Sequence, residues 1–339
     1  MTKKVILVTG ATGFLGSNII KALRQRDDVR LIAACRSQSR LPVEFEGEVR
    51  EGDLCDPVYR RSAVQDVDVV CHAGTWAAMW NHARHEGEKF YRPTVDLLEQ
   101  AIAAGVKRFV MASTVAIAQS QTAATRYDDF SPTGAKEFWP HLDYLVQLDS
   151  YMKANANRGM QMVTLRLGHF VGAGNRLGLV PVLLPRLKSR IVPWLAGGKS
   201  RLPLIADTDL GNAFVAAAFA EALQGYESFN ICGAEFPTTR EVFDFIVQKT
   251  GLPKPLYSVP YPAGYMFAWL MEKLFPLLPG RAPFLTRSIV HLAEEWVCDG
   301  QYAEMKLGYR PKKNWQDALE EAVTELESRS FPWPYLAQV

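Results

Sequence analysis

The chain has 339 residues, of which 48% are hydrophobic and 22% charged, and its formal net charge is +2. This composition is typical of a globular protein with one large or two modest domains, and it gives no electrostatic reason to expect nucleic acid as a partner. The start shows no signal-peptide pattern and the five cysteines are scattered, so we expect a cytoplasmic protein with reduced thiols. No ligand spacing surrounds the histidines, so we expect no metal site.

The run VILVTGATGFLG near the N-terminus predicts a strand, a glycine-rich turn and a helix, in this order. The first glycine permits a tight turn, the second lets a pyrophosphate approach the backbone, and the third lets the helix pack closely on the strand. The helix N-terminus would then face the phosphates of a dinucleotide. The cofactor-binding residues expected here are Gly10, Thr12, Gly13, Phe14, Leu15 and Gly16.

The second predicted strand, 29–36, ends in Cys35 and Arg36, where an acidic residue would hold the ribose hydroxyls of NAD. Arginine accepts no hydrogen bonds, but its planar fork can bind the 2′-phosphate of NADP. We therefore expect NADP as the cofactor. NAD stays possible if Arg36 is only a solvated side chain at a strand end.

Strand and helix patterns continue to alternate along the first half of the chain, which predicts an α/β fold with a doubly wound parallel sheet, the Rossmann arrangement. Ligands then bind at the carboxyl ends of the strands. Further strands are expected at 48–54, 67–74, 108–114 and 162–168, with a helix at 86–104.

Prolines and glycines become frequent after residue 176, where the chain leaves the sheet. We expect residues 1–175 with 204–232 to form the dinucleotide-binding domain, and 176–203 with 233–339 a smaller C-terminal lobe that binds a small-molecule substrate. The apolar segment 263–279 is too short and too interrupted to span a bilayer. It is either a helix of the core or of a homodimer interface, or it is a flap over an apolar substrate or a contact with a membrane surface.

Several motifs resemble the extended short-chain dehydrogenase/reductase family, of the NAD-dependent epimerase/dehydratase type. They are TGATGFLG, GDL at 52–54, CHAG at 71–74, FVMASTVAI, LRLGHFVGAGN at 165–175 and KLGYRPKKNWQDALEEAV at 306–323. The chain is most similar to the branch that contains 3β-hydroxysteroid dehydrogenases and dihydroflavonol reductases.

This resemblance implies roles for individual residues. Asp53 and Leu54 would contact the adenine, and Ala73 and Gly74 would pass the nicotinamide ribose. Thr114 would be the catalytic hydroxyl residue. The remaining implied site residues are Tyr144, as the catalytic and cofactor-binding tyrosine, and His169 and Phe170, beside the nicotinamide.

The resemblance also implies hydride transfer between a nicotinamide and a carbonyl or hydroxyl carbon, with the tyrosine handling the proton. The family's lysine, four residues after the tyrosine, is replaced by Leu148, and Phe90 stands where the family often has asparagine. His141 or His169 could carry the proton instead. Alternatively, Tyr144 is an ordinary helix residue, because leucines and Met152 recur around it at helical spacing.

Three functions follow as hypotheses. The first is an NADP-dependent oxidoreductase acting on a carbonyl or hydroxyl of a small, apolar substrate. The second is a nucleotide-sugar epimerase or dehydratase. The third is an NADP-binding regulator that has lost its catalytic activity.

Overall fold

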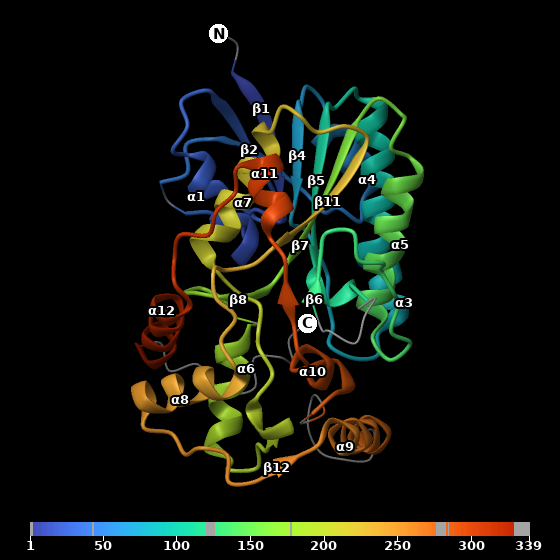
Figure 1. Ribbon diagram of the computed structural model, residues 1–339. Coiled ribbons are helices and arrows are strands. Elements are labelled where there is room, and N and C mark those ends of the chain that lie inside the picture. The colour runs from blue at the N-terminus through green and yellow to red at the C-terminus, as the bar shows by residue number, and fades with distance from the viewer. Residues whose placement is uncertain are drawn as a thin grey trace.

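The computed structural model describes residues 3–42, 44–119, 126–176, 178–275, 283 and 285–328. Seven parallel strands form one sheet in the order β11-β7-β5-β4-β1-β2-β3 (Figure 1). The strand order reverses at β1, which confirms the predicted doubly wound sheet. The strands are β1 (Lys4–Thr9), β2 (Val29–Cys35), β3 (Glu48–Glu51), β4 (Val69–His72), β5 (Arg108–Thr114), β7 (Gln161–Leu167) and β11 (Tyr226–Ile231).

Helices cover both faces of the sheet, because its central strands are apolar on both sides. In β1, Ile6 and Val8 belong to one apolar cluster, whereas Leu7 between them belongs to the cluster on the opposite face. The first face carries α1 (Phe14–Leu23), α7 (Asp207–Phe219) and α11 (Gln301–Leu307). The second face carries α2 (Pro57–Ala63), α4 (Arg92–Ala103) and α5 (Pro140–Ala154).

The helix expected at 86–104 begins earlier and is not regular. It consists of α3 (Ala83–Glu86), a π-helical turn η2 (Gly87–Tyr91) and then α4. Such a turn inserts one extra residue into the helix and often lies at a functional site.

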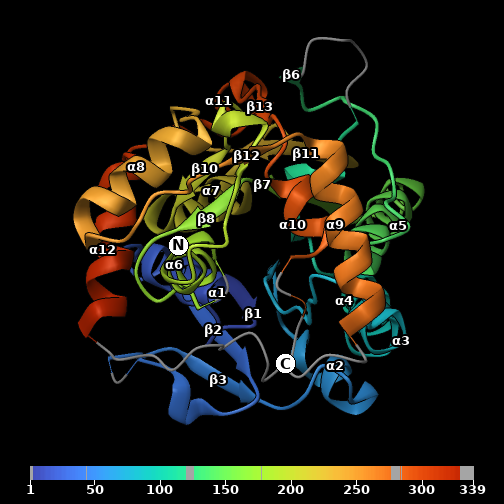
Figure 2. The same ribbon diagram turned by 90° about the horizontal axis from the view of Figure 1, so that it is seen from below.

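A second apolar core lies at the carboxyl ends of the strands, in the lower half of Figure 1. It is built by α6 (Leu179–Lys188), α8 (Thr239–Thr250) and α12 (Trp315–Ser328), with the paired strands β8 (His169–Val171) and β10 (Leu204–Ala206). Figure 2 shows α9 (Tyr261–Leu274) beside α10 (Arg287–Leu292) on the opposite side of this region. The other short strand pairs are β9 (Trp194–Leu195) with β12 (Ser258–Val259), and β6 (Arg126–Tyr127) with β13 (Val297–Cys298).

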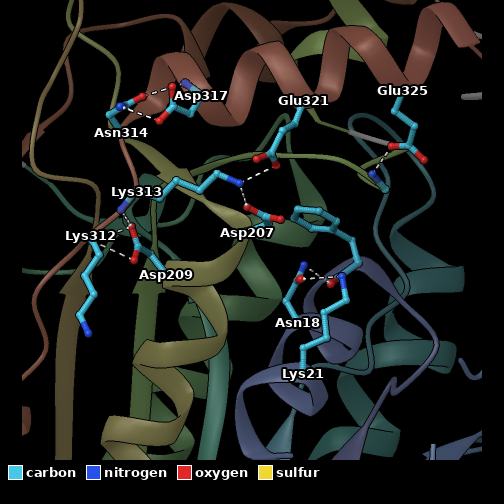
Figure 3. A network of polar contacts seen from close by, with 12 residues as sticks. Asn18, Lys21, Asp207, Asp209, Lys312, Lys313, Asn314, Asp317, Glu321 and Glu325 are labelled. Atoms are coloured by element: carbon cyan, nitrogen blue, oxygen red, sulfur yellow. Dashed lines mark hydrogen bonds and ion pairs between the residues drawn. The ribbon is translucent and has the colours of Figure 1, made fainter. Parts of the chain in front are cut away.

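A polar network fastens the C-terminal segment to α7 (Figure 3). Nζ of Lys313 lies 3.0 Å from Oδ1 of Asp207 and 2.5 Å from Oε2 of Glu321 on α12. The buried carboxylate of Asp209 accepts hydrogen bonds from the backbone N–H groups of Lys312 and Lys313. These contacts hold α12 beside the carboxyl ends of the strands.

The apolar segment expected at 263–279 is helix α9 over Tyr261–Leu274, and residues 276–279 lie outside the described part. Among the described residues, no helix combines the length and the apolar character that crossing a bilayer requires.

Candidate active site

The glycine-rich loop between β1 and α1 has the geometry of a phosphate cradle. Gly10 has a φ of +63°, and a Cβ there would lie 2.7 Å from the backbone nitrogen of Gly74. A Cβ on Gly16 would lie 2.2 Å from the carbonyl oxygen of Gly10, so this glycine packs the helix against the loop. Gly13 caps α1 without a side-chain hydrogen bond, which leaves the N–H groups of the first turn for an anion. A dinucleotide pyrophosphate therefore fits this loop.

The loop opens into a cavity of about 2060 Å³. This volume is well above the roughly 300–1,000 Å³ of a typical ligand site, so the cavity has room for a dinucleotide and a second molecule. It runs along the carboxyl ends of the strands and into the second apolar core. Of the cofactor-binding residues expected from the sequence, the lining includes Gly10, Thr12, Gly13, Phe14, Leu15, Arg36, Asp53, Leu54, Ala73, Gly74, His169 and Phe170. Gly16 and Tyr144 are not among its lining residues.

The end of β2 presents two guanidinium groups to the cavity. Arg36 follows the strand directly, and the turn η1 (Gln38–Arg40) adds Arg40, which the sequence analysis did not single out. Both side chains are exposed, and no ion pair joins either of them to another described residue. Among the described lining residues the carboxylates are Asp53 and Glu88, and neither stands at the end of β2.

A buried histidine supports the neighbouring strand end. His72 lies between Thr9 and Thr94, with its ring nitrogens 2.8 and 3.1 Å from their hydroxyl oxygens. Burial lowers the pKa of His72 to about 4, so the ring is neutral at physiological pH. The backbone N–H of Gly74 donates to the same Thr9 hydroxyl, which fixes the loop after β4. His72 is therefore a structural residue of the cofactor side.

Two hydroxyl groups lie at the end of β5. Thr114 lines the cavity, and its Oγ1 accepts a hydrogen bond from the N–H of Ala116, which leaves its own proton free to donate. The preceding Ser113 also lines the cavity, is 7% exposed, and its buried Oγ has no hydrogen-bond partner among the described residues. A buried hydroxyl without a partner is rare and indicates a place where a ligand oxygen can bind. Ser113 was missed, although it stands next to the residue that the motif singled out.

Helix α5 turns a different face to the cavity from the one that the sequence suggested. The hydroxyl of Tyr144 donates to the carbonyl oxygen of Ala83, 3.2 Å away, and its ring stacks on Tyr91. Leu148 is fully buried in the apolar core between the helix and the sheet. The residues of α5 that line the cavity are His141 and Leu145, one helical turn apart. The pair at spacing i, i+4 that faces the cavity is therefore three residues earlier than the expected pair, Tyr144 and Leu148.

His141 is held between an aromatic ring and a carboxylate. Its ring lies 5.1 Å from that of Phe90, centroid to centroid, and its Nδ1 lies 3.3 Å from Oε2 of Glu86. Glu86 is fully buried, and its other oxygen accepts a hydrogen bond of 2.7 Å from the N–H of Ala78. Neither Nδ1 of His141 nor Oε2 of Glu86 has a hydrogen-bond partner among the described residues. The separation of 3.3 Å places these two buried polar atoms side by side.

The strand β8 brings His169 and Phe170 to the cavity, as expected from the motif that contains them. Burial first, and then the nearby His291, lowers the pKa of His169 to about 4. The ring of Phe170 lies 6.0 Å from that of Phe14, so β8 and the glycine loop meet across the cavity wall. A neutral His169 is an acceptor or a single donor, and it is a poor source of protons near neutral pH.

The part of the cavity beyond β8 is lined mainly by apolar side chains from segments far apart in the sequence. On α9, Phe267 lines it, and Phe267, Met266 and Trp269 are all exposed. The cations in this part are Arg176 and Arg186. The apolar lining residues here are Leu179, Val182, Leu183, Ile191, Val192, Leu195, Leu202, Phe243, Val259, Phe267, Leu285, Ile289 and Leu292.

No three histidine, cysteine, aspartate or glutamate side chains in the described part of the chain gather in a way that would bind a metal ion.

Comparisons with known proteins agree with this geometry. The model of the NAD dependent epimerase/dehydratase family matches residues 6–232. A 2-alkyl-3-oxoalkanoate reductase of Stenotrophomonas maltophilia is 28% identical over 338 residues, which cover 96% of this chain and 99% of that protein. A putative dihydroflavonol 4-reductase of Synechocystis is 25% identical, with 96% and 95% covered. The crystal structure of the dTDP-glucose 4,6-dehydratase DesIV from Streptomyces venezuelae, with NAD and TYD bound, has a TM-score of 0.74 at 20% identity and covers 96% of this chain and 97% of its own. The chain belongs to the NAD dependent epimerase/dehydratase family.

Proposed function

We propose that this protein is an NADP-dependent oxidoreductase that acts on a carbonyl or hydroxyl group of a largely apolar substrate. The observation that carries the proposal is the single cavity that joins the glycine loop, the hydroxyls of β5 and the apolar region beyond β8. A bound nicotinamide supplies the hydride in reduction and accepts it in oxidation. The name of the relative from Stenotrophomonas, a reductase of 2-alkyl-3-oxoalkanoates, agrees with this assignment.

The residues of this chain would orient the substrate and stabilise the charge that develops on its oxygen. The hydroxyls of Ser113 and Thr114 are free to donate to a carbonyl oxygen placed at the end of β5. The apolar walls formed by α6, α9 and α10 would bind an alkyl chain and exclude water from the reacting carbon. Burial of an apolar chain contributes about 0.8 kcal/mol per methylene group, so the lining favours long-chain substrates.

The preference for NADP rests on Arg36 and Arg40. Both line the cavity where the 2′ position of the adenosine ribose is expected, and among the described residues no carboxylate at the end of β2 lines the cavity. We expect Arg36→Ala to weaken NADPH binding about 10- to 150-fold, the effect of losing one charged hydrogen-bonding group of about 1.5–3 kcal/mol. NADH binding should change less than about threefold. Equal losses for the two cofactors would contradict the phosphate-binding role.

A second candidate is nucleotide-sugar epimerisation or dehydration, which the cavity-lining cations Arg176 and Arg186 favour, because a substrate diphosphate needs such groups. The crystal structure of DesIV, a dehydratase of this kind, shares the fold. Two panels distinguish the candidates. Oxidation of NADPH by long-chain 3-oxo acids and esters supports the first, and conversion of UDP- or dTDP-sugars without net cofactor consumption supports the second. Tight NADP binding with no turnover in either panel would indicate a regulator.

A further inference from the structure

We propose that His141 is the proton donor of this site, and that the buried carboxylate of Glu86 positions it. The inference rests on the proposed oxidoreductase function. It assigns proton donation to the imidazole of His141, which the carboxylate of Glu86 orients, in place of the Tyr144 hydroxyl that the motif suggested.

The position of His141 supports the first half of the proposal. The ring lines the same cavity as the hydroxyls of Ser113 and Thr114, and its helix α5 contacts the turn η3 (Val115–Ile117) that directly follows β5. Its Nδ1 is buried against Glu86, so Nε2 is the ring nitrogen left to meet a substrate oxygen. In contrast, the Tyr144 hydroxyl is outside the cavity lining and is bound to the carbonyl oxygen of Ala83.

The environment of Glu86 supports the second half. A fully buried carboxylate is costly unless a positive or hydrogen-bonding group faces it, and the N–H of Ala78 satisfies only one of its oxygens. The other oxygen, Oε2, lies 3.3 Å from Nδ1 of His141, at the separation of an ion pair. In the neutral ring, a carboxylate at this nitrogen favours the tautomer with the proton on Nδ1.

The backbone between Glu86 and α4 brings the two groups together. Gly87 begins the π-helical turn, and a Cβ there would lie 2.7 Å from the hydroxyl oxygen of Tyr144. The lack of a side chain therefore lets α5 approach the turn. Phe90, which replaces the expected asparagine, packs on the His141 ring and restricts its rotation.

In the reduction step, the hydride comes from the nicotinamide and the proton comes from His141. The carbonyl carbon gains the hydride from the reduced nicotinamide, and the electron pair of the C=O π bond moves onto oxygen. That oxygen forms an O–H bond as the Nε2–H bond of His141 breaks, and the hydroxyls of Ser113 and Thr114 donate hydrogen bonds to it. His141 is left neutral with its Nδ1 proton facing Glu86, and it regains a proton at Nε2 from water in the cavity.

Other charged and titratable groups of the described residues lie in the same cavity as His141 or on the same helix. Glu88 and Lys89, from the π-helical turn, line the same cavity with opposite charges. On α5 itself, Asp143 accepts a hydrogen bond from the backbone N–H of Lys136. The imidazoles His72 and His169 line the cavity from the strands, and burial lowers the pKa of each to about 4, so both are neutral.

The test compares three single variants of the full-length protein. His141→Gln removes the exchangeable ring proton, Glu86→Gln keeps the shape and the hydrogen bond from Ala78, and Tyr144→Phe removes the rival hydroxyl from the same helix. The probes are NADPH and ethyl 3-oxodecanoate. We expect His141→Gln to lower kcat about 10²–10⁴-fold, the usual contribution of a general acid, with NADPH affinity unchanged, and Tyr144→Phe to stay within about twofold of the wild type.

Glu86→Gln has an expected effect that a purely structural role would not produce. The ¹⁵N chemical shifts of the neutral His141 ring, measured without cofactor or substrate, should show the proton on Nδ1 in the wild type and a mixture of tautomers in the variant.

The outcomes separate this inference from the proposed function. Wild-type activity with an unaffected His141→Gln variant, or a Tyr144→Phe variant that loses activity, would overturn the role of His141. A wild-type ring with its proton on Nε2 would overturn the role of Glu86 whether or not the ketone is a substrate. If the wild type transfers no hydride to any ketone, the proposed function fails, and the ring tautomer still decides whether the pair exists.

Discussion

Replacing Gly13 by alanine should disrupt cofactor binding while leaving the fold intact. Gly13 has φ −83° and ψ 169°, an extended conformation that any residue adopts. An added Cβ would meet only the carbonyl oxygen of Gly10, at 3.2 Å, and would otherwise point into open space at the cavity. Substitution of Gly10 or Gly16 would not test cofactor binding alone, because a Cβ at either position would lie under 3.0 Å from backbone atoms and would disturb the fold.

The magnitude follows from the contacts that the methyl group would prevent. A Cβ at the cap of α1 keeps a pyrophosphate away from the N–H groups of the first helical turn. Loss of one charge-assisted hydrogen bond costs about 1.5–3 kcal/mol, which corresponds to a Kd for NADPH that is about 10- to 150-fold higher. The free energy of unfolding should change by less than about 1 kcal/mol, because the backbone conformation is unstrained.

Two measurements check this prediction: NADPH fluorescence titration for the Kd, and urea unfolding for stability. Gly300→Ala is a matched control, because no atom lies within 4 Å of a Cβ at this position and it is remote from the cavity lining. A folded Gly13→Ala variant that binds NADPH as tightly as the wild type would refute the assignment of this loop to the pyrophosphate.

Two further predictions concern stability. Burial raises the pKa of Asp129 to about 6, above the value of about 4 in the unfolded chain, so its contribution to stability is present below pH 4 and is lost as pH rises through 6. The Asp129→Asn side chain can still accept the hydrogen bond from the N–H of Asn230. At pH 8 the substitution should therefore raise the free energy of unfolding, measured by urea titration, by about 1–3 kcal/mol, and this gain should shrink towards pH 4. A gain independent of pH would contradict the role of ionisation. Lys313→Met leaves the nearly buried Asp207 without its cation and should cost about 2–4 kcal/mol, whereas Lys249→Met, which breaks the exposed pair with Glu320, should cost less than about 1 kcal/mol. Equal losses in the two variants would show that the network in Figure 3 does not hold α12 in place.

The conformation of the glycine loop was predictable from the sequence because its determinants are local. Strand, glycine turn and helix follow one another within 20 residues, and steric demands at Gly10 and Gly16 leave few alternatives. Arg36 and Asp53 could be placed at the cavity for the same reason, since Arg36 directly follows β2 and Asp53 lies two residues after the end of β3. The leucine stripe of α5 also predicted its buried face, and Leu142, Leu148 and Met152 are fully buried.

The reaction side depends on contacts that no local pattern specifies. The stripe on α5 fixes which residues face the sheet, but the edge of the helix that faces the cavity depends on its approach to the π-helical turn at Gly87. Tyr144 matched the expected residue type, whereas His141, three residues earlier, reaches the cavity. Glu86 gave no signal, because its burial results from packing against α5 and the loop at Ala78. Likewise, the apolar walls come from segments more than 100 residues apart, such as 179–202 and 285–292.

The most direct test of the proposed function follows the hydride itself. The protein is incubated with NADPH that carries deuterium at C4 of the nicotinamide, together with long-chain 3-oxo esters, and the products are analysed by mass spectrometry. We expect one deuterium atom on the new carbinol carbon, in stoichiometric balance with the NADP formed. Conversion of a UDP- or dTDP-sugar by the same protein, with no deuterium transferred to any 3-oxo ester, would contradict the proposed function.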